Sequence, residues 1–571
     1  MISLIVKTRR VSCDVLVIGC GSAGLRAAIE AHDLGADVLI LSKSKKGDPH
    51  TVLATGGINA ALGTMDPKDS WQLHAADTIR DGRMINDSGK VEILCRDGPR
   101  AVKELVKWGA RFHREKDGRI TQRFFGAATY RRACFYGDYT GREMTRVLTE
   151  QAVKRKIKFI DGVYVTKILK RGKEAVGALG VDFSRKEAVV VGCGCIVLAG
   201  GGYSRVYSVS SSRLDENYGE GVKLALDAGA ELIDMEMVQF HPTGMVWPKK
   251  AVGVLVTEAV RGEGGILYNA RHERFMKNYD PERMELGPRD EVARANYSEI
   301  LHGRGTRHGG VLLDISHLPK EKILSRLPRM YKQFKEMVGI DISRSPMEVS
   351  PTAHYSMGGV RVDRLGRTGI PGLLAVGEVT GQLHGGNRLG GNSLLETVVF
   401  GKIVGKEAAR LAESRKNARV DIDDVGRELP PVMNGAMKAR ARIQELSWKS
   451  IGIVRDGDGL RKALAGLKKI RAECERKATK PRIGEGMEAT FQVMSILDAA
   501  ECIARSALER KESRGAHTRS DFPKEDERWL LNVCCRKSAG GISVSKRKLA
   551  PLSPAMKKLV GRPKPKNHLL E

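Results

Sequence analysis

The amino-acid sequence predicts an α/β protein with a doubly wound sheet, an inserted second domain and a C-terminal helical domain. Three observations carry this prediction: a strand–helix–strand pattern at 13–41, two more apolar runs of strand length at 189–198 and 372–377, and long helical patterns from 432 to 510. Apolar runs bounded by glycine are typical of buried parallel strands. Strands that alternate with helices indicate a sheet covered on both faces.

A glycine-rich turn, Gly19-x-Gly21-x-x-Gly24, separates the first strand from its helix. Such glycines allow a tight turn and a close approach of the backbone to a pyrophosphate, which then faces the helix N-terminus. We therefore expect a dinucleotide site that includes Gly19, Gly21, Ser22, Ala23 and Gly24. The acid that usually follows the second strand is replaced by Ser42 and Lys43, so a ribose contact there would use the Ser42 hydroxyl or backbone.

The secondary-structure pattern and the distribution of charged, Gly and Pro residues divide the chain into five parts. Residues 1–244 and 351–414 share the strand–helix rhythm, with 65–120 mostly helical and a helix at 401–414, whereas 245–350 are more charged and carry scattered Gly and Pro. We expect these to be a split nucleotide-binding domain and its insertion. A linker at 415–431 leads into a helical domain at 426–523, and 524–571 form a basic tail.

The composition places the protein inside the cell. No apolar run reaches eighteen residues, so no membrane span is expected, and the N-terminus continues directly into the first strand rather than into a cleavage site. The ten cysteines lack zinc or iron–sulfur spacing. We therefore expect no metal, and electrons would pass to another protein or a diffusible partner.

The net charge is +29, and residues 536–571 hold ten basic residues against one acidic residue. Such a tail suits nucleic acid, an anionic membrane face or an acidic partner subunit, or is simply solvated. Aromatic residues make up 5% of the chain and do not interleave with the basic ones, which argues against nucleic acid. A partner subunit is the favoured functional interpretation.

A segment at 47–63 identifies a family. It contains His50-Thr51, then Thr55-Gly56-Gly57, and it resembles the flavin loop of the succinate dehydrogenase/fumarate reductase flavoprotein subunits. The resemblance extends from 14 to 523 and implies a Rossmann-like FAD domain split by a capping domain. It also implies a covalent bond between His50 and the flavin, which would raise the flavin potential. Asp48-Pro49 departs from the family's usual residues before the histidine.

Further matches imply other contacts. Phe125 resembles the family phenylalanine that lies over the substrate, and Glu220 stands where the family has an aspartate for the adenosine ribose. The remaining flavin contacts implied by the resemblance are Ala199, Gly200, Gly201, Glu378, Ser393 and Leu394. The segment 512–523 resembles the end of the family's helical domain, which would be structural and would face an iron–sulfur subunit.

Four segments resemble the family's active site, and they supply His241, Thr257, Glu258, Arg261, Arg289, His354 and Arg388. Taken singly, each has a structural interpretation, such as a surface ion pair or a helix-face pair. Together, in family order, they imply a dicarboxylate site. Arg388 would clamp one carboxylate bidentately, with His241, Thr257 and His354 as further donors. Arg289 would deliver the proton, reloaded through Glu258 and Arg261.

The sequence thus predicts a flavoprotein that interconverts succinate and fumarate by hydride transfer with FAD. Two alternatives stay open: an L-aspartate oxidase, which lacks the flavin-bound histidine, and a flavin scaffold that serves only electron transfer. The resemblance implies an iron–sulfur partner subunit and a cytoplasmic location, at the inner face of the membrane through other subunits. No nucleic-acid partner is expected.

Overall fold

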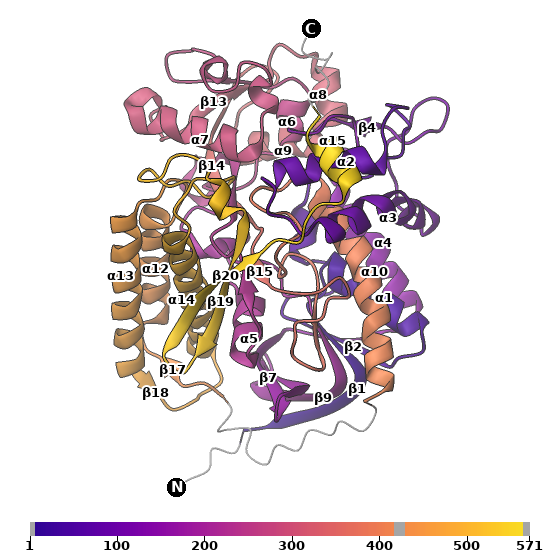
Figure 1. Ribbon diagram of the computed structural model, residues 1–571, viewed down its shortest axis with the longest axis vertical. Coiled ribbons are helices and arrows are strands. Elements are labelled where there is room, and N and C mark those ends of the chain that lie inside the picture. Colours follow the sequence, from indigo (N-terminus) through magenta and orange to yellow (C-terminus); the bar gives the residue numbers. More distant parts are fainter. Residues whose placement is uncertain (1–5, 416–428, 563–571) are drawn as a thin grey trace.

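The computed structural model describes residues 6–415 and 429–562 and confirms the predicted fold class (Figure 1). Its main sheet has the order β6-β2-β1-β9-β8-β7, with β16 also paired to β9. The strands are β1 (Thr8–Ile18), β2 (Val38–Ser42), β6 (Lys158–Asp161), β7 (Val163–Arg171), β8 (Glu174–Asp182), β9 (Glu187–Leu198) and β16 (Leu373–Ala375). The strands β6, β2, β1, β9 and β16 pair in parallel, and β7 and β8 extend the sheet as an antiparallel hairpin.

Alternating side chains of β1 pack against opposite layers. Val15 and Val17 contact the helices on one face, and Leu16 and Ile18 belong to the core on the other face. The first layer contains α1 (Ser22–Asp33), α2 (Trp71–Asp81), α3 (Ser88–Lys107), α4 (Thr140–Lys154) and α10 (Asn392–Glu413). The second contains α5 (Glu220–Ala228) and the C-terminal bundle. Covering both faces explains why these strands read as continuous apolar runs.

The expectation that 65–120 is mostly helical is confirmed by α2 and α3. After α3 the chain turns at Gly109 and Gly118, which take positive φ values. The helix expected at 401–414 is α10 and begins nine residues earlier, at Asn392. Gly391, at φ 86°, precedes its first turn.

The inserted region forms a second antiparallel sheet of order β11-β14-β13-β12. Its strands are β11 (Val238–Met245), β12 (Ile266–Tyr268), β13 (Val311–Asp314) and β14 (Met347–Ser356), and its helices are α6 (Ala259–Gly262), α7 (Arg289–Glu299), α8 (Lys320–Arg326) and α9 (Pro328–Met337). The strands β11 and β14 cross the expected boundaries at 244 and 351. The inserted region therefore joins the nucleotide-binding domain through paired strands. The nucleotide-binding domain also contains a small sheet of β3 (Ile58–Asn59), β5 (Ala133–Cys134) and β4 (Gln122–Arg123).

The C-terminal region contains a bundle of α12 (Ala436–Ser450), α13 (Gly457–Arg476) and α14 (Glu485–Glu509), with the short pair β17 (Val432–Met433) and β18 (Ala478–Thr479). The Asp456 side chain caps α13 by accepting a hydrogen bond from the Gly459 backbone. The start of the expected helical domain, 426–428, and most of the expected linker lie outside the described residues. Within the described residues, no helix is long and apolar enough to cross a membrane.

The prediction of a basic tail at 524–571 is wrong for the part that the structure describes, 524–562. The strands β19 (Leu531–Ser538) and β20 (Gly541–Lys548) form a hairpin that joins β10 (Leu232–Ile233) and β15 (Gly359–Val360) in one sheet. The chain then crosses the molecule to α15 (Pro554–Val560), which packs on α2 (Figure 1). Several basic side chains of the hairpin pair with acids: Arg536 and Arg547 with Glu231, Lys537 with Asp227, and Lys546 with Glu509. Residues 563–571 lie outside the described residues.

A buried ion network fixes the segment at 512–523 to the core. Arg510 donates to Glu236 at 2.7 Å and to Glu512 at 3.0 Å, and all three side chains are fully buried. Glu512 also holds Arg514 at 2.8 Å. These contacts fit the structural role expected for the segment.

We expect Arg510→Ala to lower the free energy of unfolding by about 3–5 kcal/mol, because it leaves the buried Glu236 carboxylate without its cation and removes one of the two cations at Glu512. Thermal denaturation followed by circular dichroism measures the effect. The matched control is Arg528→Ala, since its side chain is 89% exposed and pairs with Asp526 at the surface. Equal denaturation temperatures for the two variants would show that the buried network contributes no more than a surface pair.

Candidate active site

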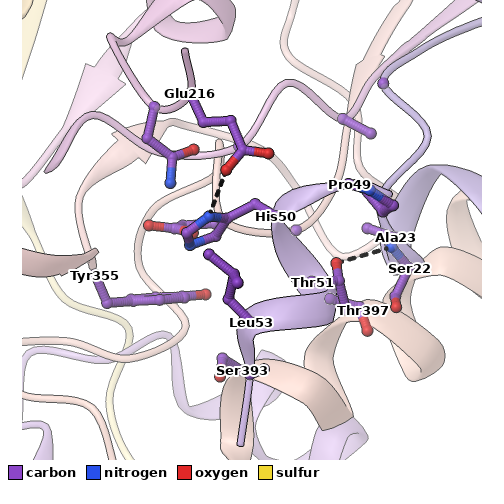
Figure 2. A pocket seen from close by; sticks show the side chains of 18 of the residues that line it. Ser22, Ala23, Pro49, His50, Thr51, Leu53, Glu216, Tyr355, Ser393 and Thr397 are labelled. Carbon is purple, nitrogen blue, oxygen red and sulfur yellow. Dashed lines mark hydrogen bonds and ion pairs between the residues drawn. The ribbon is translucent and has the colours of Figure 1, made fainter. Parts of the chain in front are cut away.

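One cavity lies where the carboxyl ends of the parallel strands meet the inserted sheet, and Figure 2 shows part of its wall. It brings together all but two of the predicted site residues. From the predicted cofactor set it is lined by Gly19, Gly21, Ser22, Ala23, Ser42, Lys43, His50, Thr51, Thr55, Gly56, Gly57, Ala199, Gly200, Gly201, Glu220, Glu378, Ser393 and Leu394. From the predicted catalytic set it is lined by Phe125, His241, Thr257, Glu258, Arg289, His354 and Arg388. The exceptions, Gly24 and Arg261, lie behind this wall.

The glycine turn after β1 leaves no room for side chains. Gly19 has φ +111°, and a Cβ atom there would lie 2.3 Å from the Ala199 carbonyl oxygen at the end of β9. A Cβ on Gly24 would lie 2.1 Å from the Gly19 carbonyl oxygen. Gly24 therefore serves close packing of α1 on the turn rather than direct contact with a ligand. Side chains are thus excluded at Gly19 and Gly24, while Cys20, Ser22 and Ala23 bring small side chains to the cavity wall.

Ser42 and Lys43, which stand where an acidic residue usually contacts the ribose, make contacts of their own at this end of the cavity. Lys43 Nζ lies 2.5 Å from Glu220 Oε1, and the Tyr164 hydroxyl donates to the same oxygen at 3.2 Å. The Ser42 hydroxyl lies 2.9 Å from Cys20 Sγ. The carboxylate at this end of the cavity thus comes from Glu220 on α5, and Lys43 takes the place after β2 where an acid was expected.

His50 begins a short 3-10 turn, and its ring faces Glu216 (Figure 2). The distance from His50 Nδ1 to Glu216 Oε2 is 2.9 Å, and Arg213 links Glu216 to Asp48. Burial disfavours the imidazolium, but the hydrogen bond and charge of Glu216 outweigh it and raise the pKa of His50. Among the described residues, none hydrogen-bonds the other ring nitrogen, Nε2, which therefore remains available to a ligand.

A buried ion pair joins Arg289, the first residue of α7, to Glu258, which precedes α6. Arg289 Nε donates to Glu258 Oε2 at 2.8 Å, and its Nη1 donates to Gln239 at 3.0 Å. Burial alone would raise the pKa of Glu258, but the charges of Arg289 and Arg261 lower it below its usual value. Arg261 Nη2 lies 3.8 Å from Glu258 Oε1. The three side chains form a row that ends at the cavity with Arg289.

Two histidines of the cavity wall pack edge to face, with ring centroids 5.2 Å apart. His241, on β11, is held through Nδ1 by the Thr243 backbone, and His354, on β14, lies 2.8 Å from the Ser211 hydroxyl through Nδ1. Burial is the main reason that the pKa of each ring lies well below the usual value. The charge of Arg289 lowers the pKa of His241 further, and His241 and Arg388 lower that of His354. Both rings are therefore neutral near pH 7.

The remaining predicted side chains complete the wall. Thr257 is 1% exposed, and its hydroxyl accepts from the Ala259 backbone. Phe125 lies against Gly56, where a Cβ atom would be 2.7 Å from its ring. Arg388 is buried, its Nη1 donates to Ser393 at 2.9 Å, and its Nε has no hydrogen-bond partner among the described residues.

Sequence reasoning missed several wall residues, among them Glu216, Tyr164, Tyr355, Ser211 and Thr397. Tyr355 directly follows His354 on β14, and adjacent residues of a strand point to opposite faces, so the position of His354 gives no sign that Tyr355 also reaches the cavity. Glu216 lies four residues before Glu220 in a loop without a recognisable motif. Their positions depend on contacts between distant segments, for which a single sequence holds no local signal.

The cavity fits FAD. At its phosphate end, a Cβ atom on Gly19 or Gly24 would overlap backbone atoms, and this glycine turn leads into α1, a helix of twelve residues. At its other end lies Arg388, whose Nε has no hydrogen-bond partner among the described residues. A helix N-terminus with exposed backbone amides suits a pyrophosphate. Residues of β1, β9, α5 and the loop before α10 would hold the two halves of the dinucleotide.

Comparisons with known proteins agree with this geometry. A model of the FAD binding domain family matches residues 14–394, and a model of the fumarate reductase flavoprotein C-terminal domain matches residues 440–559. The chain belongs to the flavoprotein subunits of succinate dehydrogenases and fumarate reductases. The predicted family is thereby confirmed, and with it the assignment as an FAD-dependent oxidoreductase.

Relatives in this flavoprotein family align over nearly the whole chain. A fumarate reductase (CoM/CoB) chain from Methanothermobacter marburgensis is 45% identical, covering 91% of this chain and 96% of its own. The 8-methylmenaquinol:fumarate reductase flavoprotein subunit of Wolinella succinogenes is 36% identical, covering 91% and 87%. Among solved structures, Mycobacterium smegmatis Sdh1 in complex with UQ1 superposes with a TM-score of 0.85 at 38% identity, covering 96% of each chain.

We expect Gly19→Ala to weaken FAD binding by about tenfold or more, because the new methyl group overlaps a fixed carbonyl and strains the backbone. The ratio of flavin to protein absorbance in the purified variant measures the loss. Gly35→Ala is the matched control, since it shares a positive φ of +91° but has no atom within 4 Å of the new Cβ. Full flavin occupancy in Gly19→Ala would contradict the assignment of the turn.

Proposed function

We propose that this flavoprotein interconverts fumarate and succinate as the catalytic subunit of a larger complex. The observation that carries the proposal is the buried Arg289–Glu258 pair, which ends at the same cavity as His241, His354 and Arg388. Three cationic or donor groups gathered around one small space suit a ligand with two carboxylates. When bound, FAD supplies or accepts the hydride.

Arg388 would clamp one carboxylate of the substrate. Its free Nε and buried guanidinium offer a charge that no protein carboxylate contacts directly among the described residues. His241 and His354 are each held through Nδ1, so Nε2 is the nitrogen left for the substrate, and a neutral ring donates one hydrogen bond there. Thr257 would add a hydroxyl. These groups would orient the substrate and polarise its double bond.

Arg289 would deliver the proton to the substrate carbon. An arginine is a weak acid in water, so the transfer needs a dry site and an immediate source of replacement. Glu258 Oε2 accepts from Arg289 Nε, and Arg261 lies on the far side of the same carboxylate. A proton leaving Arg289 would be replaced through Glu258, and Arg261 would hold that carboxylate in its charged form. In succinate oxidation Arg289 would act as the base.

We also propose that His50 binds FAD covalently through Nε2. The support is local: Glu216 engages Nδ1, and Nε2 has no protein partner among the described residues (Figure 2). A carboxylate on one imidazole nitrogen increases the basicity of the other, as it does for metal-bound histidines. Such a link would raise the flavin potential and favour hydride removal from an unactivated carbon.

We propose that electrons pass between FAD and a partner subunit that carries iron–sulfur clusters. The relatives named above are themselves subunits, and the Methanothermobacter relative is a fumarate reductase named for CoM and CoB. By that likeness, fumarate reduction is the favoured direction. Contact with a membrane would come only through other subunits.

We expect Arg289→Gln to lower the rate of fumarate reduction by about 10²–10⁴-fold, the range of a lost general acid, while flavin absorbance is retained. Reduced viologen oxidation with fumarate measures the rate. The control is Arg294→Gln on the same helix, a partly exposed side chain paired with Asp290. Unchanged reduction in Arg289→Gln would favour the electron-transfer scaffold.

In the wild-type protein we expect flavin fluorescence to stay with the denatured polypeptide in an acidic gel, and the His50 peptide to carry the mass of FAD. In His50→Ala the flavin should separate on denaturation, and succinate oxidation should fall more than fumarate reduction because the flavin potential falls. The exposed His302 provides the control variant, His302→Ala. Release of all flavin from the wild type would restrict the site to non-covalent FAD.

A further inference from the structure

The charge of Arg388 is stabilised in an unusual way. The side chain is 3% exposed, and burial, followed by the charge of Arg289, lowers its pKa to about 10. Its only hydrogen bond among the described residues goes to the Ser393 hydroxyl. Glu378 and Glu258 influence it without direct contact. A buried guanidinium with so few polar partners needs another source of stabilisation.

The ring of Tyr355 supplies it. The Arg388 guanidinium carbon lies 4.1 Å from the centroid of the Tyr355 ring. The face of an aromatic ring carries partial negative charge and attracts a cation, most strongly where water is excluded. Tyr355 is 7% exposed, so this contact is shielded from solvent. Unlike a carboxylate, a ring face does not neutralise the cation or occupy its donors.

A second set of contacts fixes the ring itself. The Tyr355 hydroxyl donates to Glu396 Oε2 at 2.9 Å and lies 3.4 Å from His384 Nε2. His384 Nε2 in turn lies 3.0 Å from the same Glu396 oxygen, and Thr380 donates to the other oxygen at 3.4 Å. Glu396 belongs to α10, which packs on the main sheet, so the ring is anchored to a rigid element.

We propose that Tyr355 is a positioning residue that holds Arg388 ready for a substrate carboxylate, with Glu396 and His384 anchoring its ring. The inference rests on the proposed role of Arg388 as the carboxylate clamp. A protein carboxylate in the place of the ring would hold Arg388 equally well but would compete with the substrate for its donors. The aromatic face stabilises the cation and leaves Nε and one terminal nitrogen to the ligand.

The test uses FAD-loaded protein and three variants. Tyr355→Leu removes the ring, Tyr355→Phe keeps the ring but removes its anchor, and Glu396→Gln weakens the anchor from the other side. The control is Tyr331→Leu, since the Tyr331 hydroxyl bonds Asp341 in the inserted region. Calorimetric titration with malonate, an unreactive dicarboxylate, measures binding per bound flavin, and steady-state assays separate KM from kcat for fumarate.

We expect Tyr355→Leu to weaken malonate binding and raise KM by about tenfold, the scale of a buried cation–π contact. Tyr355→Phe and Glu396→Gln should show smaller losses, and the ring-retaining Phe variant should recover most of the binding lost in Leu. Binding by Tyr355→Leu equal to that of the wild type would overturn the inference. If Tyr355→Leu does not fold, malonate binding equal to that of the wild type in both Tyr355→Phe and Glu396→Gln would overturn the anchoring role of Glu396.

A separate measurement distinguishes this inference from the proposed function. If the wild type neither binds malonate nor reduces fumarate, the dicarboxylate function fails. Modification of Arg388 by phenylglyoxal, followed by peptide mass spectrometry, then reports on its positioning without any substrate. Faster modification in Tyr355→Leu than in the wild type would support the role of Tyr355, and an unchanged rate would overturn it.

Discussion

The buried pair of Arg289 and Glu258 is the contact on which the cavity depends. A single charge at either position would be too costly to bury, since an unpaired ion loses several kcal/mol of hydration. The pair also joins three separate segments, because Glu258 precedes α6, Arg289 begins α7 and the Gly126 backbone donates to the same carboxylate at 2.8 Å. The placement of the inserted region over the nucleotide-binding domain is therefore coupled to a charge balance inside the site.

Around Glu258 that balance leaves more positive than negative charge, because Arg289, Arg261 and, at longer range, Arg388 share this one carboxylate. Glu258 is shared by Arg289 and Arg261, so it cannot also neutralise Arg388. Burial, followed by the charges of nearby arginines, lowers the pKa of His241 and of His354 and keeps both rings neutral. In the proposed function, selectivity for a doubly charged anion would follow from this charge distribution as well as from the shape of the pocket.

The sequence predicted the fold class and the local motifs well, because both leave short-range signals. The glycine turn, the flavin loop and the histidines each depend on neighbours in the chain, and the cavity contains nearly all of them. The omissions were of another kind, because the wall residues Glu216 and Tyr355 come from segments far from their partners. The basic region after 524 read as a tail because its partners lie about 300 residues earlier: β19 pairs with β10, and Lys537 and Arg547 pair with Asp227 and Glu231.

The path of the last sixty residues bears on how the chain matures. β19 pairs with β10, about 300 residues earlier, and Arg80 on α2 donates to the Val560 carbonyl at the end of α15. Contacts of such long sequence separation form late, and on the ribosome they cannot form before the C-terminus has emerged. The core of the nucleotide-binding domain can collapse earlier, but the sheet beside the cavity is completed only by these last strands. A chain cut short after α14 would thus keep the residues that line the cavity, which end at Thr397, but would leave β10 without its partner strand β19 and so expose an unpaired sheet edge.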